Sequence, residues 1–202
     1  MVSIRRLILA GALIIANSTA AAAQTTPGNI WRHGTTANIF AGVASSASRT
    51  RSVVGGGVGW EVTPWVGLEG RFAWQDRARD EDAFAAELGA HVNLLSERPV
   101  VPFVKGGVGL YRASFGRVLD DIPEFYRRRL APPDPALRAR QTFTDPSLVV
   151  GGGVNVYVSR HVAIRPEIEA IAIRRDGRGH VVTAVTIHLA YHFEEHPITP
   201  SR

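Results

Sequence analysis

The sequence predicts an all-β protein, an eight-stranded antiparallel up-and-down transmembrane β-barrel. The main observation is that three extended segments carry glycine at alternate positions, while the opposite face of each segment is mainly apolar. The alternating glycines are Gly55, Gly57 and Gly59; Gly107 and Gly109; and Gly151 and Gly153. Residues two apart share one face of a strand, so each segment has a bare side and an apolar side. An apolar side that faces outward is the reverse of a soluble domain and predicts contact with lipid.

Eight segments with period-two alternation are the second observation. We expect strands at residues 38–47, 53–63, 66–75, 84–95, 101–113, 148–158, 162–173 and 181–193. In the first segment small residues occupy both faces, which makes its pattern the weakest. The second alternates glycine with Val54, Val58 and Trp60, and the third places Leu68 and Phe72 on its apolar face.

The later segments show the same alternation. Residues 84–95 are rich in Ala, Glu and Leu, as helices are, but their apolar residues recur at every second position, which is strand spacing. Residues 101–113 and 148–158 each combine a glycine run with a valine-rich face. In residues 162–173, Ile164 and Ile168 lie opposite Arg165 and Glu167. The last segment alternates without interruption from Val181 and is the clearest.

An export signal at the N-terminus is the third observation. Arg5 and Arg6 precede an apolar run at residues 7–16, and residues 21–23 are alanines suited to cleavage. This run is well short of the roughly 20 residues of a spanning helix, which disfavours a membrane anchor. We expect residues 1–23 to be a removed signal peptide and residues 24–37 a periplasmic segment. The barrel would occupy residues 38–193, with residues 194–202 as a periplasmic tail.

The composition restricts the classes of partner and stabilising bond. The chain has no cysteine, so an exported fold must be stable without disulfides. It has 23 basic and 18 acidic residues, and two of the basic ones lie in the expected signal peptide. The small remaining positive excess is weak evidence for nucleic acid, and we expect no such partner.

The connections and the aromatic residues indicate an orientation in the membrane. Residues 63–65, 96–99 and 159–161 are tight turns, whereas residues 48–52, 76–83, 114–145 and 174–180 are generally longer and charged. Outer-membrane barrels have short periplasmic turns and longer extracellular loops, and aromatic girdles at both interfaces. The residues expected in these girdles are Trp60, Trp65, Phe103, Tyr191 and Phe193 toward the turns, and Phe72, Trp74 and Phe115 toward the loops.

The inward faces of the expected strands are charged. An eight-stranded barrel is only wide enough for side chains to fill it, and buried charges are costly unless paired. Arg71, Lys105 and Arg165 are therefore expected to pair with glutamates, and the glycines to leave room for these long side chains. The expected network comprises Glu61, Glu69, Arg71, Glu87, His91, Lys105, Arg165, Glu167 and Glu169. It predicts a plugged lumen rather than an open pore.

Other chemistries fit these residues less well. The glycine runs continue as strands and no Walker lysine follows, so they do not form a phosphate-binding loop. His188 and His192 share a face but lie about 13 Å apart along a strand, too far for one metal ion without bridging neighbours. His91 with a glutamate could act as an acid–base pair. We expect no catalytic residue, no metal and no cofactor.

The connection at residues 114–145 contains a second candidate site. Asp120, Asp121 and Pro123 precede apolar residues at helical spacing, which predicts a short amphipathic helix. Its end would carry Arg127, Arg128 and Arg129, where positive charge complements the helix dipole. One hypothesis is that these arginines bind lipopolysaccharide phosphates or an acidic partner surface. The alternative is a solvated run of charge in a loop.

Residues 55–74, 101–111 and 151–169, with the closing AYHF at 190–193, resemble the small outer-membrane β-barrel family. This family comprises the eight-stranded domains of outer membrane protein A-like and opacity-type proteins, and the resemblance covers residues 35–193. It implies a location in the outer membrane of a Gram-negative cell, contact with outer-membrane lipids and lipopolysaccharide, and insertion by the barrel-assembly machinery.

We expect an integral outer-membrane barrel with a structural or surface-interaction role and no enzymatic activity. A narrow, porin-like channel or a small-ligand-binding barrel using the charged lumen is the alternative. A lipid-modifying outer-membrane enzyme is a further alternative, since fold alone does not determine function. A soluble lipocalin-like barrel would need the opposite pattern, with apolar residues inside. The oligomeric state stays open.

Overall fold

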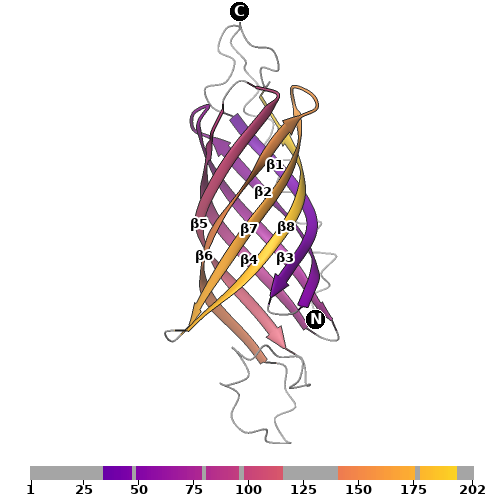
Figure 1. The fold of residues 1–202 in the computed structure, drawn as a ribbon, viewed down its shortest axis with the longest axis vertical. Coiled ribbons are helices and arrows are strands. Elements are labelled where there is room, and N and C mark those ends of the chain that lie inside the picture. Colours follow the sequence, from indigo (N-terminus) through magenta and orange to yellow (C-terminus); the bar gives the residue numbers. More distant parts are fainter. Residues whose placement is uncertain are drawn as a thin grey trace, which may run out of the picture. The chain divides into compact units, whose positions relative to one another are not determined.

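The computed structural model describes residues 34–46, 49–78, 81–95, 98–115, 141–175 and 178–194. These residues form a closed antiparallel barrel in which each strand pairs with its neighbours in sequence and β1 pairs with β8 (Figure 1). The strands are β1 (Gly34–Ser46), β2 (Arg49–Glu61), β3 (Val66–Ala78), β4 (Glu81–Asn93), β5 (Val100–Phe115), β6 (Gln141–Tyr157), β7 (Val162–Arg175) and β8 (Arg178–His192). The predicted fold class is confirmed. No helix in the described part of the chain is long and apolar enough to span a membrane.

The two ends of the barrel differ in their connections. At one end, called the turn rim, residues 62–65, 94–99 and 158–161 join the strands, and β1 begins and β8 ends there. At the other end, called the loop rim, residues 47–48, 79–80, 116–140 and 176–177 lie between strands. Residues 1–33 and 195–202, which include the expected signal peptide and most of the expected tail, lie outside the described residues.

The strands extend further toward the loop rim than the sequence pattern predicts. Pairs such as Ser45 with Thr50, Asp76 with Asp82 and Arg174 with Gly179 belong to the strand ladders, although all of these residues except Ser45 were expected in connections. Only the connection at residues 116–140 is long at this rim. The physical reason is that backbone pairing continues beyond the segment where side chains alternate between apolar and polar. β1 likewise begins at Gly34 rather than at residue 38.

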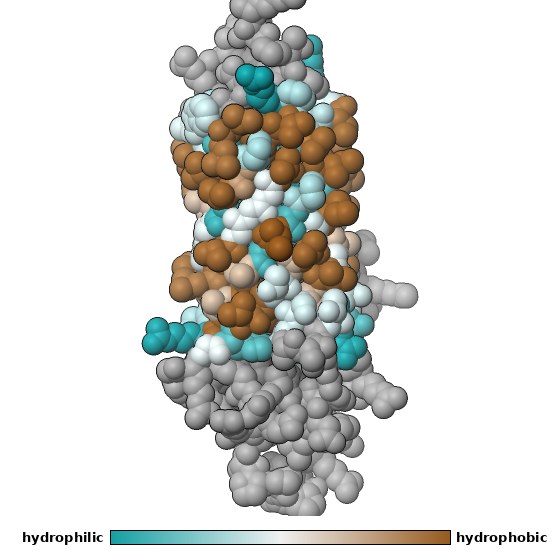
Figure 2. Space-filling view, in the orientation of Figure 1, coloured by the Kyte–Doolittle hydropathy of each residue, from teal (hydrophilic) through white to brown (hydrophobic). Residues whose placement is uncertain are grey.

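The outer face of the barrel is apolar. Leu88, Ile39 and Ile187 are 71%, 66% and 62% exposed, and they belong to a set of exposed large apolar side chains on all eight strands. Hydrophobic residues cover much of the visible side of the barrel, with hydrophilic residues grouped near its two ends (Figure 2). Such a surface is stable only against another apolar phase, so the barrel wall is built to face lipid.

Candidate functional site: the barrel lumen

Arg71 on β3 is the central cation of the lumen. Its Nη2 donates to Glu87 Oε2 on β4 at 2.6 Å, and its Nη1 donates to Glu167 Oε1 on β7 at 2.6 Å. Nη2 also donates to Glu169. The guanidinium lies over the ring of Phe40, 5.4 Å from the ring centroid. One arginine thus links β3, β4, β7 and, through the aromatic ring, β1.

Arg165 and Lys105 extend this ion pairing. Arg165 donates through Nη2 to both oxygens of Glu69, at 2.7 and 2.9 Å, and through Nε to Glu167 Oε2 at 3.1 Å. Lys105 Nζ donates to Glu169 Oε2 at 2.6 Å and also to Glu167. Three cations and four carboxylates form one continuous group, called here the lumen cluster. Its members are Glu69, Arg71, Glu87, Lys105, Arg165, Glu167 and Glu169.

The glycine stripes leave the space that these side chains occupy. A Cβ on Gly57 would lie 3.0 Å from Arg71 Cγ, and one on Gly151 would lie 2.9 Å from Glu169 Cβ. A Cβ on Gly55 would lie only 2.3 Å from the Phe40 ring. Real Cβ contacts under 3.0 Å essentially never occur and contacts of 3.0 Å are rare, so the glycines and the large lumen groups are complementary in volume.

Glu61 and His91 form a separate pair near the turn rim. His91 Nε2 and Glu61 Oε1 are 3.1 Å apart, and both side chains are buried. None of the ion pairs among the described residues joins Glu61 or His91 to the lumen cluster. Further toward this rim, Asn93 donates to the Pro64 carbonyl at 3.1 Å. The sequence places all nine expected residues in the lumen, and the structure divides them into the cluster of seven and this pair.

An apolar layer fills the lumen between the lumen cluster and the loop rim. On β7, Ile171 and Ile173 follow Glu169 on the same inner face, and they are 1% and 0% exposed. On the neighbouring strand, β8, Val182 belongs to the same layer and is 1% exposed. The members of this apolar layer are Ala44, Val53, Ala73, Ala83, Ala85, Tyr111, Ala113, Ile171, Ile173, Val182 and Ala184, with Phe40 and Val149 at the edge of the lumen cluster. The lumen is therefore stratified along the barrel axis.

The apolar layer is the feature that the sequence reasoning missed. A signal for it exists in β7, where the residues at every second position change from Glu167 and Glu169 to Ile171 and Ile173. The assignment of Phe103 to an outer girdle was wrong. Phe103 is 3% exposed and lies inside, with Arg165 Cζ 5.1 Å from its ring centroid. The reason is strand alternation, because Phe103 lies two residues from the inward Lys105.

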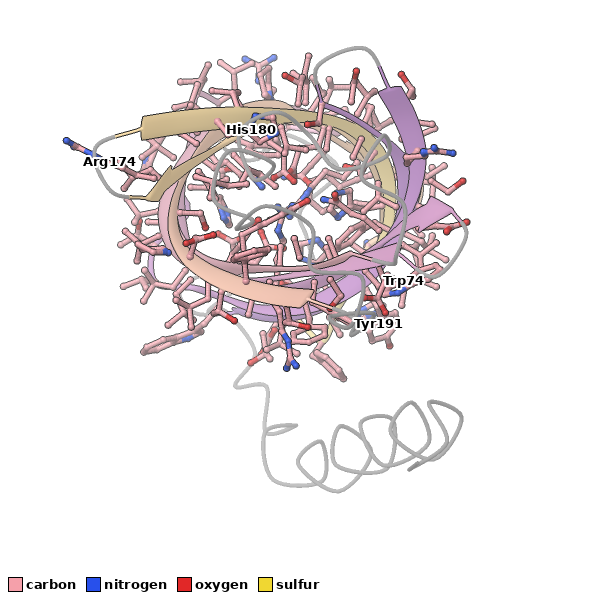
Figure 3. All side chains as sticks on the ribbon, turned by 90° about the horizontal axis from the view of Figure 1, so that it is seen from below. Trp74, Arg174, His180 and Tyr191 are labelled. Carbon is pink, nitrogen blue, oxygen red and sulfur yellow. The ribbon has the colours of Figure 1, made fainter. Side chains whose placement is uncertain are left out.

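Side chains of the described strands project into the lumen, as the view along the barrel axis shows (Figure 3). A cavity of about 20 Å³ lies beside Glu69, Arg71, Glu87, His91 and Lys105, which is room for about one water molecule. Among the described residues no group of three His, Asp or Glu side chains is arranged to hold a metal ion. Arg127, Arg128 and Arg129, the second candidate site, lie outside the described residues.

Comparison with solved structures finds the same fold. Neisserial surface protein A has a TM-score of 0.58 at 13% identity, covering 79% of this chain and 96% of that protein. The N-terminal β-barrel domain of Pseudomonas aeruginosa OprF has a TM-score of 0.53 at 12% identity, covering 77% and 96%. The attachment invasion locus protein Ail of Yersinia pestis has a TM-score of 0.51 at 14% identity, covering 79% and 97%. At these identities the likeness concerns the fold alone.

A search of curated proteins found no match. The family model for the outer membrane protein β-barrel domain matches residues 9–193, which is most of the chain. The closed eight-stranded barrel, its apolar outer face and this match agree with one another. The chain therefore belongs to the outer membrane protein β-barrel domain family and is located in the outer membrane of a Gram-negative cell.

Proposed function

We propose that this protein is a structural or surface-interaction barrel of the outer membrane whose lumen is sealed to ions and solutes. The proposal rests on two successive layers of side chains inside the barrel, the lumen cluster and the apolar layer. An ion crossing the barrel would have to separate several buried ion pairs and then pass a mainly apolar layer, whose few polar side chains include Gln75, hydrogen-bonded to Tyr111, and Ser147. Each step costs several kcal/mol in a low-dielectric interior.

The contacts of the lumen cluster support a structural rather than a catalytic role. Its cations each bind two or more carboxylates, and the cavity beside them has room for only about one water molecule. Glu61 and His91 resemble an acid–base pair, but both are buried, and substrate access would require the rim to open. We therefore propose that the protein has no enzymatic activity. Any recognition of a partner occurs at its surface, and outer-membrane lipids surround the barrel wall at all times.

A narrow channel is the second candidate, and the charged side chains around the small cavity favour it. Conductance of the refolded full-length chain in planar bilayers separates the two functions. The sealed barrel is expected to give no stable conductance step. A reproducible step that Arg165→Gln or Glu167→Gln abolishes would replace the sealed barrel by the channel.

The partners predicted from the sequence are also part of this proposal. Insertion by the barrel-assembly machinery is supported by the strand β8, which closes the barrel against β1, carries exposed Tyr191 and ends at His192, directly before Phe193. Binding of lipopolysaccharide phosphates by Arg127, Arg128 and Arg129 is tested by replacing all three with glutamine. Unchanged binding and membrane integrity would refute that role.

A further inference from the structure

The lumen cluster contains fewer cations than carboxylates. Its three cations, Arg71, Lys105 and Arg165, face four glutamates, which leaves an excess of one negative charge when every group is ionised. None of these seven side chains is more than 9% exposed. A buried charge without compensation is strongly destabilising. The cluster is therefore one positive charge short.

Among the members of the lumen cluster, Glu87 is the one with a buried oxygen that nothing binds. Its Oε2 accepts from Nη2 and Nε of Arg71, at 2.6 and 3.2 Å, whereas its Oε1 has no hydrogen-bond partner among the described residues. Glu167, by contrast, accepts from all three cations and uses both of its oxygens. A proton on Oε1 of Glu87 would supply the missing positive charge and turn this oxygen into a hydrogen-bond donor.

The water-sized cavity of about 20 Å³ in the lumen lies beside Glu87 and His91. These two residues lie on the inner face of β4 with Gly89 between them, and Gly89 pairs with Gly107 on β5. Because neither glycine has a side chain, the space between Glu87 and His91 stays open. Nε2 of His91 lies 3.1 Å from Glu61 Oε1, whereas Nδ1 is buried with no hydrogen-bond partner among the described residues. Oε1 of Glu87 and Nδ1 of His91 are therefore the atoms left to bind a water molecule in the cavity.

We propose that the lumen binds one proton on Glu87 and one water molecule in the cavity, and that His91 and Glu61 exchange this proton with the solution at the turn rim. The carboxyl O–H of Glu87 donates to the water, the water donates to Nδ1 of His91, and Nε2–H of His91 donates to Glu61. When each donor passes one proton to its acceptor, one proton moves from Glu87 to Glu61 and the imidazole changes tautomer. Glu61 is the last residue of β2 at the turn rim, so this carboxylate is the exit of the path.

Other charged and titratable groups face this path from the neighbouring strands. They are Glu69 and Arg71 on β3, Lys105 and Tyr111 on β5, Tyr157 on β6, Arg165, Glu167 and Glu169 on β7, and His188 and His192 on β8; β1 has none. Tyrosine and histidine side chains are ordinarily uncharged at about pH 8. The neighbours outside the lumen cluster therefore do not remove its excess negative charge.

The first test measures how stability depends on pH, with the full-length chain refolded in detergent and unfolded in urea. The folded chain holds one proton more than the unfolded chain, so its folding equilibrium constant should fall about tenfold per unit between about pH 7 and about pH 9. Glu87→Gln has its own donor and no charge, so this fall should disappear in that variant. Asp76→Asn is the matched control, because Asp76 is an exposed carboxylate on β3 and its loss should leave the fall unchanged.

Infrared spectroscopy tests the proton and its path directly. At about pH 8, where solvated carboxylates are ionised, the wild-type chain and Asp76→Asn should show the band of a protonated carboxyl group, and Glu87→Gln should lack it. In His91→Gln the side-chain amide still donates to Glu61 but does not relay a proton. This variant should keep the band, while the shift of the band after transfer to deuterium oxide should slow several-fold.

Three results would overturn the proposal. The first is an equal fall of stability with pH in Glu87→Gln and Asp76→Asn. The second is a wild-type spectrum without the carboxyl band, which decides the matter even if Glu87→Gln does not fold. The third is equally fast deuterium exchange in the wild-type chain and His91→Gln, which would exclude the path through His91. The charge count is the same in a sealed and in a conducting barrel, so conductance measurements do not bear on this proton.

Discussion

Arg71 and Glu167 are 96 residues apart in the chain, and Nη1 of the arginine lies 2.6 Å from Oε1 of the glutamate across the barrel. The two residues lie on β3 and β7, which are opposite strands of an eight-stranded closed sheet. The contact therefore spans the lumen and ties two opposite walls together. It exists only when the barrel is closed.

Replacing Arg71 by glutamine is expected to destabilise the barrel strongly. The change leaves Glu87 without its partner and removes one of two cations from Glu169, so buried carboxylates lose compensation. Breaking a buried pair from one side costs about 3–5 kcal/mol. Unfolding in urea, followed by gel mobility of the unheated protein, measures this loss. Arg98→Gln at the turn rim should leave the midpoint unchanged, and equal midpoints for both variants would contradict a structural lumen cluster.

Gly55→Ala is expected to destabilise the barrel more than Gly106→Ala. A Cβ on Gly55 would lie 2.2 Å from the Phe72 carbonyl oxygen and 2.3 Å from the Phe40 ring, whereas the nearest atom to a Cβ on Gly106 is 3.8 Å away. Overpacking of this kind costs about 1–3 kcal/mol, because neighbours must move. Unfolding in urea, followed by gel mobility, measures the loss of stability in each variant. A larger loss for Gly106→Ala would mean that the lumen is not filled as described.

Single cysteines are expected to report where the wall leaves the hydrocarbon layer. The chain contains no cysteine, so each introduced thiol is the only one. Thr144→Cys lies on β6 near the loop rim, and Leu148→Cys lies about 13 Å further along the strand on the same face. A membrane-impermeant maleimide added to intact cells should label Thr144→Cys but not Leu148→Cys.

The turn rim supplies the control for this labelling. Ser159→Cys, in the connection between β6 and β7, should react only after the outer membrane is permeabilised. Labelling of Ser159→Cys and not Thr144→Cys in intact cells would reverse the expected orientation of the barrel.

His161→Ala is expected to loosen the closing strand. His161 Nδ1 donates to the His192 carbonyl at 2.8 Å, and the His192 N–H donates to the His161 carbonyl at 2.7 Å. The imidazole also stacks on Tyr191, with ring centroids 5.7 Å apart. Losing the side-chain hydrogen bond and the stacking should cost about 1–2 kcal/mol.

The variant His161→Phe separates these two contributions, because it keeps an aromatic ring and removes the donor. Its stability, measured by the temperature of the gel-mobility shift, should lie between those of the wild-type chain and His161→Ala. A wild-type temperature for His161→Ala would show that the turn does not hold β8.

Much of the lumen could be predicted because the period of a strand is two. Once Val104 is assigned to the lipid side, Lys105 must face inward. The same alternation places Arg165 and Glu167 inside the barrel. Phe103 follows the same rule and was misassigned because its position near a strand end was given more weight than its alternation. The strand ends were less predictable, since the ladder between Asp76 and Asp82 continues where the hydrophobic pattern stops.

The sequence by itself determined the barrel, its number of strands and, apart from Phe103, which side chains face lipid, because alternation and glycine placement are local properties of the chain. Only the tertiary structure decided which lumen groups meet, since Arg71 reaches Glu87 on the adjacent strand and Glu167 on the opposite one through closure of the sheet. Closure also separated Glu61 and His91 from the lumen cluster and stacked Ile171 and Val182 into an apolar layer. Those relations depend on register and on strand tilt around the whole barrel, and no single segment of the chain encodes them.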